Sequence, residues 1–239
     1  MFDEDDDDNS PDLLTIKTVL IGDSGVGKTS IIKQFSNDEF DPECVSSIGG
    51  QYNSKKMTIN DKEIKLDLWD TAGQDRYRSL AKIFYQDAKI IVFVYDITSI
   101  KSFEGIKNYW YKQIQSNSDK EAILALAGNK SDLYINEEVK TQDAKEFADS
   151  IGAIFQTTSA KSNIGIDLLF KNIVKKYLNP DYDYRKDEEN EKKIYKAKKE
   201  NQIKERNEND DFNENNISMN SIKLYNDFVK KSSKKNFCC

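Results

Sequence analysis

The stretch that most constrains this chain is Gly22–Thr29, which reads Gly-Asp-Ser-Gly-Val-Gly-Lys-Thr. It matches the phosphate-loop template, in which glycine, four residues, glycine, lysine and serine or threonine follow one another. The apolar, β-branched run Thr15–Ile21 before it predicts a buried strand, and Ser30–Phe35 after it opens a helical pattern. A strand that enters a helix through such a turn directs backbone N–H groups and the helix dipole at one point, where a polyphosphate can bind.

The loop also supplies side chains for phosphate chemistry. Lys28 can bridge the outer phosphates and support catalysis, and the Thr29 hydroxyl can ligate Mg²⁺. The remaining phosphate-contact candidates are Asp23, Ser24, Gly25, Val26, Gly27 and Ser30. The alternative is a glycine-rich turn that contains Gly-Lys-Thr by chance, and the flanking strand and helix disfavour it.

Composition excludes several classes of function. The chain has 239 residues and a net charge of −6, so one core domain with tails fits, and no general basic face argues for nucleic-acid binding. It has no histidine, which removes Ser-His-Asp and Cys-His catalysis and most zinc chemistry. Its three cysteines indicate no disulfide framework. We expect a disordered acidic tail at 1–12, a core domain at 13–178, and a mostly disordered tail at 179–239.

Alternating strands and helices predict an α/β fold. A hairpin is expected from strands Ser54–Ile59 and Glu63–Trp69. Buried strands at Lys89–Tyr95, Ile123–Ala127 and Ala153–Gln156 alternate with helices at Ser102–Gln115, Thr141–Ser150 and Ile164–Tyr177. This order predicts a six-stranded, mostly parallel sheet with one antiparallel strand and helices on both faces. Ligands of such sheets bind at the carboxyl ends of the strands.

Two further motifs follow predicted strand ends. In Trp69-Asp70-Thr71-Ala72-Gly73-Gln74, Asp70 can hold Mg²⁺, the Gly73 N–H can bond a γ-phosphate, and Gln74 can orient an attacking water. An ordinary turn would use similar residues. In Asn129-Lys130-Ser131-Asp132, the Asp132 carboxylate can accept two hydrogen bonds from the adjacent donors of guanine, a pair that adenine lacks. A surface turn remains an alternative for this motif taken alone, and Ser159-Ala160-Lys161 could close over the base.

Together, these four motifs resemble the Ras-superfamily small GTPases over about Ile16–Tyr177, and within them the Rab family. The Rab-like stretches are Trp69–Gln74, Arg76–Leu80, Tyr95–Thr98, Ser102-Phe103 and the final Cys238-Cys239. Gly49-Gly50, Ser79-Leu80-Ala81 and Ala125–Lys130 are most similar to the early-endosomal Rab branch. The resemblance implies the small-GTPase (Ras-like) P-loop fold, GTP/GDP and Mg²⁺ as ligands, and slow GTP hydrolysis.

The resemblance also implies roles for isolated residues. Phe40 corresponds to the aromatic that flanks the guanine ring, although a core or loop aromatic is equally plausible from the residues alone. Ser47 stands where the family has a threonine that ligates Mg²⁺ and senses the γ-phosphate, and it lacks that residue's methyl group. Tyr52, Trp69 and Phe84 match the effector-facing aromatic residues of Rabs, with aromatics of the sheet edge as the alternative.

Finally, the resemblance implies a membrane cycle. Cys238-Cys239 is similar to the Rab signal for double geranylgeranylation, and the alternative is an unmodified tail. The expected protein is a monomer on the cytoplasmic face of intracellular membranes, with endosomal membranes as the suspected location. It would cycle through the cytosol. Its expected partners are an exchange factor, a GTPase-activating protein, an escort or GDP-dissociation-inhibitor type of chaperone, and GTP-dependent effectors. The rival function is a GTP-locked recruitment module that does not hydrolyse GTP; a Ran-like GTPase and a phosphate-loop kinase fit the motifs less well.

Overall fold

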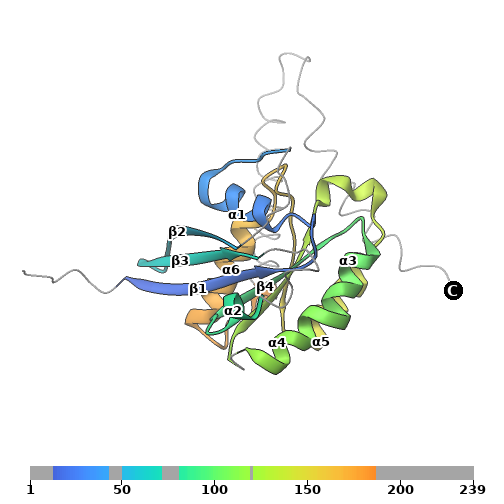
Figure 1. Ribbon diagram of the computed structural model, residues 1–239. Helices are drawn as coiled ribbons and strands as arrows, with labels where there is room; N and C mark the ends of the chain where they lie inside the picture. Colours follow the sequence, from blue (N-terminus) through green and yellow to red (C-terminus); the bar gives the residue numbers. More distant parts are fainter. Residues whose placement is uncertain (1–12, 43–49, 72–80, 119–120, 187–239) are drawn as a thin grey trace, which may run out of the picture. The chain divides into compact units, whose positions relative to one another are not determined.

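The computed structural model describes residues 13–42, 50–71, 81–118 and 121–186 of the chain, without the side chains of residues 81 and 82 (Figure 1). The chain divides into two units, Met1–Tyr184 and Arg185–Cys239. The first unit contains all of the strands and helices whose bounds are given below. In the part of the chain that is described, no helix is long and apolar enough for a membrane span.

Six strands form one sheet in the order β2-β3-β1-β4-β5-β6. The strands are β1 (Leu14–Ile21), β2 (Gln51–Ile59), β3 (Lys62–Asp70), β4 (Ile90–Asp96), β5 (Ile123–Asn129) and β6 (Ile154–Thr157). β2 pairs antiparallel with β3, and the other neighbours pair in parallel. The hairpin turns at Asn60 and Asp61, which both have positive φ and are residue types that tolerate it. The α/β sheet that the sequence predicts, with one antiparallel strand, is confirmed.

Helices cover the sheet on two faces, and each face has its own apolar core (Figure 1). On one face, α1 (Lys28–Asn37) and α6 (Ile166–Leu178) pack against even-numbered residues of β1 and β3 such as Leu20 and Leu66. On the other face, α3 (Ile100–Gly105), η2 (Ile106–Trp110), α4 (Tyr111–Asn117) and α5 (Thr141–Ser150) pack against residues such as Val19 and Phe93. This alternation is the two-residue period of a strand that is buried on both faces.

Two short helices were not predicted. α2 (Ala81–Tyr85) has only five residues, and η3 (Ser131–Asn136) is a 3-10 helix with a kink at Leu133. Helices this short lack the two turns of apolar spacing on which a sequence pattern depends. The predicted helix Ser102–Gln115 also contains a π-helical segment, η2, between α3 and α4.

The packed domain continues beyond residue 178, where the sequence analysis ended it. Tyr184 is buried in the same core as α1 and α6, and Tyr182 packs against that core. The Tyr182 hydroxyl donates to Asn172 Oδ1 at 2.9 Å, and Lys176 Nζ donates to the Tyr182 carbonyl at 3.1 Å. The two tyrosines therefore hold the segment after α6 on the domain.

Candidate functional site: a nucleotide site at the carboxyl edge of the sheet

The sequence motifs meet where the parallel strands end. β1 ends at Ile21, directly before the phosphate loop, and β3 ends at Asp70. β4 ends at Asp96 beside Asn129 at the end of β5, and β6 ends at Thr157, two residues before Ser159. This edge is where open α/β sheets bind ligands. The structure thus brings together four segments that are up to about 140 residues apart in sequence.

The glycines of the phosphate loop allow backbone approaches that a side chain would block. A Cβ on Gly22 would lie 2.2 Å from the Val94 carbonyl oxygen of β4. Gly27 has a φ of 95°, and a Cβ there would lie 2.3 Å from Asn129 Nδ2. Both contacts are shorter than non-bonded atoms tolerate, so glycine is required at both ends of the loop. α1 begins directly after Gly27, and its first N–H groups face the loop.

Lys28 places a buried ammonium group inside the loop. Its Nζ donates to the carbonyl oxygens of Gly22 and Asp23, each at 3.0 Å, and the residue is 5 % exposed. Burial lowers the pKa of Lys28 to about 8, and the nearby carboxylates of Asp70 and Asp23 oppose this shift. A polyphosphate at this position would compensate the buried positive charge, so the residues fit such a ligand.

The predicted magnesium ligands lie side by side. The Thr29 hydroxyl donates to Asp70 Oδ2 at 2.5 Å, and Asp70 is buried. Thr71 Oγ1 donates to the Leu20 carbonyl at 2.8 Å and so fixes the end of β3 against β1. Mg²⁺ binds hard oxygen donors and commonly uses one or two protein oxygens beside phosphates and water. The paired oxygens of Thr29 and Asp70 fit this requirement.

Asn129 connects the base side of the site to the phosphate loop. Its Nδ2 donates to the Val26 carbonyl at 2.9 Å. Its Oδ1 accepts from Thr158 Oγ1 at 3.2 Å and from the Ala160 N–H at 3.4 Å. The side chain is 2 % exposed, so these contacts satisfy a buried amide on both its donor and its acceptor side. Asn129 therefore ties the loop to the Ser159–Lys161 segment.

Asp132 is held in place by Ser159 of the Ser159–Lys161 motif. Ser159 Oγ donates to Asp132 Oδ1 at 2.6 Å, and the same hydroxyl accepts from the Ser162 N–H at 3.1 Å. Lys130 adopts a left-handed conformation with a φ of 65°, which turns the chain between β5 and η3 and carries Asp132 out of the strand. A carboxylate supported in this way could present fixed acceptors to the two adjacent donors of a guanine base.

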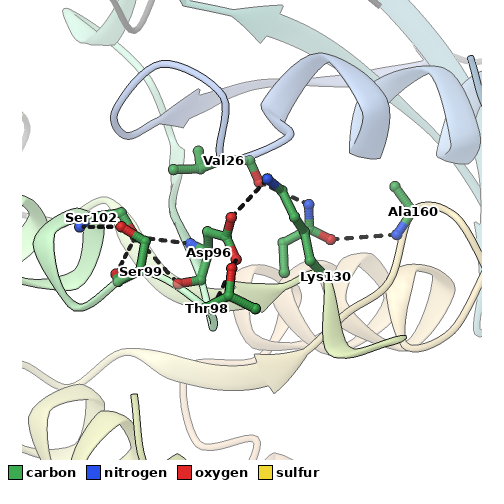
Figure 2. Close-up of polar contacts among 8 residues, drawn as sticks. Val26, Asp96, Thr98, Ser99, Ser102, Lys130 and Ala160 are labelled. Atoms are coloured by element: carbon green, nitrogen blue, oxygen red, sulfur yellow. Dashed lines mark hydrogen bonds and ion pairs between the residues drawn. The ribbon is translucent and has the colours of Figure 1, made fainter. Parts of the chain in front are cut away.

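Asp96 is a site residue to which the sequence analysis gave no role. Its Oδ2 lies 2.7 Å from Lys130 Nζ, and its Oδ1 accepts from Thr98 through both the backbone N–H (2.9 Å) and the hydroxyl (2.8 Å) (Figure 2). Ser102 Oγ accepts from the backbone N–H of Asp96 at 3.0 Å and so links the end of β4 to the start of α3 (Figure 2). An acidic residue at the carboxyl end of a buried strand was the available sequence signal.

The three aromatic residues expected to face effectors lie together. Tyr52 and Trp69 are opposite each other in the β2–β3 pair, with ring centroids 5.2 Å apart, and Phe84 of α2 lies 6.0 Å from Trp69. Tyr52 is 48 % exposed. A Cβ on Gly50 would lie 2.3 Å from Phe84, which explains why a glycine precedes β2. The alternative, aromatics of the sheet edge, fits Tyr52 on the edge strand β2, whereas Trp69 lies on β3 and Phe84 on α2.

The other predicted site residues fall into two groups. Phe40 lies three residues beyond the end of α1 and is 37 % exposed; Ser24 and Lys161 are exposed, and Ser30 is half-buried in the first turn of α1. Five predicted residues lie outside the described part of the chain: Ser47, Gly73, Gln74, Cys238 and Cys239.

The pattern of the Ras family matches residues 17–179. The chain is 41 % identical to the Ras-related protein Rab-22A of Homo sapiens over 169 residues, which are 71 % of this chain and 87 % of that protein. It is 41 % identical to the Ras-related protein RABA5a of Arabidopsis thaliana over 73 % of this chain and 78 % of that protein. It is 43 % identical to the Ras-related protein Rab-31 of Mus musculus over 66 % of this chain and 80 % of that protein.

Proposed function

We propose that this chain, which belongs to the Ras family and within it to the Rab GTPases, hydrolyses GTP slowly on a membrane and recruits effectors there. As a member of that family, it is a switch of vesicle traffic that binds GTP or GDP with Mg²⁺ and hydrolyses GTP. The proposal rests on three groups of residues that lie at one edge of the sheet. They are Lys28, the pair Thr29 and Asp70, and the pair Asn129 and Asp132. These groups match a phosphate chain, a magnesium ion and a guanine base.

The residues around the phosphates act by position and charge. Mg²⁺, when bound, neutralises charge on the phosphate oxygens. Lys28 and the loop N–H groups stabilise negative charge where it develops, and Thr29, Asp70 and Ser47 supply the metal's protein ligands. Gly73 donates its N–H to the outer phosphate, and Gln74 orients the attacking water. The chain offers no arginine at this edge among the described residues. We expect an arginine supplied by an activating protein to accelerate hydrolysis, by roughly 10³–10⁵-fold.

Base selection rests on Asp132. We expect Asp132→Asn to weaken GTP binding roughly 100-fold or more, because the amide replaces one acceptor with a donor. The same variant gains affinity for xanthosine triphosphate, whose base carries an oxygen where guanine carries its amine. Competition binding against GTP, ATP and xanthosine triphosphate measures both effects. Asp143→Asn on α5 makes the same chemical change at an exposed position and serves as the control. Unchanged guanine preference in Asp132→Asn would remove the assignment.

The signal depends on the segments beside the phosphates. In this proposal, bound GTP orders residues 40–47 and 73–84, and hydrolysis releases them. Phe40 flanks the base, and Tyr52, Trp69 and Phe84 form the surface that effectors contact. The exposure of Tyr52 and the ring contacts within this group support an accessible aromatic surface beside the changing segments.

Membrane attachment follows from the terminal cysteines. Two geranylgeranyl groups on Cys238 and Cys239 would anchor the chain stably, whereas one lipid chain anchors only marginally. Mass analysis of the C-terminal peptide from cells tests this, and an unmodified peptide in the membrane fraction would refute it. The resemblance of Gly49-Gly50 and Ser79-Leu80-Ala81 to the early-endosomal Rab branch supports the endocytic pathway. An exchange factor, an activating protein and an escort or GDP-dissociation-inhibitor chaperone would complete the cycle of a monomer between membrane and cytosol.

A further inference from the structure

One contact of the phosphate loop lies outside the phosphate-loop template. Trp110 Nε1 donates to Asp23 Oδ1 at 2.9 Å across 87 positions of sequence. Trp110 is 1 % exposed, so its indole N–H is removed from water and the Asp23 carboxylate accepts it. The template places no requirement on the residue after its first glycine, and it says nothing about a helix on the far face of the sheet. The phosphate-loop template therefore does not require this contact.

A second residue of the same helical stretch also contacts Asp23. A Cβ on Gly105 would lie 2.8 Å from Asp23 Oδ2, closer than a side chain permits. Five residues span about 1.4 turns of an α-helix, which would place Gly105 and Trp110 on different faces. Between them the helix is π-helical, and the Tyr111 N–H bonds to the Ile106 carbonyl five residues earlier. This wider turn brings Gly105 and the indole of Trp110 to the same side, around one carboxylate.

The backbone of Asp23 connects its side chain to Lys28, the residue expected to contact the phosphates. The Asp23 and Gly22 carbonyls hold Lys28 Nζ, and Gly22 is itself packed against the Val94 carbonyl. The other end of the loop is held by Asn129 through the Val26 carbonyl. The Asp23 side chain therefore fixes the first turn of the loop, as Asn129 fixes its last.

We propose that Trp110 is a positioning residue for nucleotide binding, which acts through Asp23 to hold the phosphate loop and Lys28 in the geometry that retains the phosphates. Gly105 is the second part of this device because it leaves the space that the Asp23 carboxylate occupies. The inference rests on the proposed binding of guanine nucleotide. It adds that the Trp110–Asp23 contact sets how long the nucleotide stays bound. A change in η2, on the helix that covers this face, then changes how fast nucleotide leaves.

Release of a fluorescent GDP analogue in the presence of Mg²⁺ measures the effect. We expect Trp110→Phe, which keeps an aromatic ring but removes the N–H donor, to release the nucleotide roughly tenfold faster. Asp23→Ala should have a similar effect, and the double variant should be no faster than the faster single variant, because both changes remove the same contact. Tyr109→Phe removes a hydroxyl from the neighbouring position of η2 and should release nucleotide at the wild-type rate.

Gly105→Ala separates positioning from simple destabilisation. Gly105 has helical backbone angles, so alanine should favour the helix, and the melting temperature of the nucleotide-free protein should not fall. The added Cβ nevertheless displaces the Asp23 carboxylate, and we expect faster nucleotide release. Trp110 emission, recorded in a Trp69→Phe background that leaves it as the only tryptophan, should shift in Gly105→Ala.

Two results would overturn the proposal. The first is wild-type release rates in both Trp110→Phe and Gly105→Ala, with nucleotide still bound. The second is release that rises only in proportion to a lowered melting temperature across the variants, which would make Trp110 a core residue alone. A wild-type chain that binds no guanine nucleotide would instead contradict the assigned function, so the two failures are distinguishable.

Discussion

At the scale of single residues, Asp96 holds the ammonium group of Lys130 in place through an ion pair. The carboxylate receives three contacts, one from Lys130 Nζ and two from Thr98, and it is 8 % exposed. A buried carboxylate with these partners is held in one orientation. Lys130 directly follows Asn129, whose amide reaches the phosphate loop, so a displaced Lys130 disturbs both the base side and the loop side of the site.

We therefore predict that Asp96→Ala weakens GDP binding roughly tenfold, because it removes a charged partner of Lys130. Asp96→Asn keeps an acceptor for Thr98 but loses the charge, and it should show a smaller part of the same loss. Calorimetric or fluorescence titration with GDP measures both. The effect should vanish in a Lys130→Ala background. Equal losses with and without Lys130 would show that Asp96 acts through another group.

At the scale of elements, the segment after α6 contributes to the domain's stability. Tyr184 is 8 % exposed within the core of α1 and α6, and its hydroxyl accepts from the Phe155 N–H of β6 at 3.4 Å. β6 is an edge strand, and an N–H on such an edge needs a partner or water. The tyrosine thus packs on the core with its ring and contacts the sheet edge with its hydroxyl.

We predict that Tyr184→Ala lowers the free energy of unfolding by about 3 kcal/mol, as for other large aromatics removed from a core. Tyr184→Phe keeps the ring and should cost less than about 1 kcal/mol, since only a long hydrogen bond is lost. Urea unfolding of the GDP-bound protein measures both changes. If alanine cost no more than phenylalanine, the segment after α6 would not be part of the packed domain.

Sequence reasoning succeeded where a signal is local. The predicted helix Thr141–Ser150 has the bounds of α5, and the strands lie within about three residues of their predicted ends because apolar runs and alternation are read over short windows. The phosphate loop and the Asn129–Asp132 motif were found because each occupies a few consecutive positions.

The contacts that sequence reasoning missed join distant positions. The Asp23–Trp110 and Asp96–Lys130 pairs connect residues 87 and 34 positions apart, and no local pattern marks either partner. Tyr184 was assigned to the tail because the surrounding composition is polar and acidic, although a single aromatic side chain suffices to hold a short segment on a core. The π-helical turn of η2 has no sequence signature of its own.

At the scale of the whole molecule, the candidate nucleotide site and the expected effector surface meet at the end of β3. The phosphate loop follows β1, while Trp69 stands one residue before Asp70 at the end of β3. The proposed magnesium ligand Asp70 and the proposed effector-surface residue Trp69 are therefore neighbours in one strand. This adjacency supports a switch in which the state of the phosphates changes the aromatic surface of Tyr52, Trp69 and Phe84.

The central claim is that the chain is a hydrolysing switch, and single-turnover phosphate release from GTP-loaded protein tests it most directly. We predict slow conversion of bound GTP to GDP by the wild-type chain and acceleration by an activating protein that supplies an arginine. Gln74→Leu should bind GTP normally and convert it more slowly under both conditions. Bound GTP that stays intact in the wild-type protein, with and without the activating protein, would contradict the account and show a GTP-locked recruitment module instead.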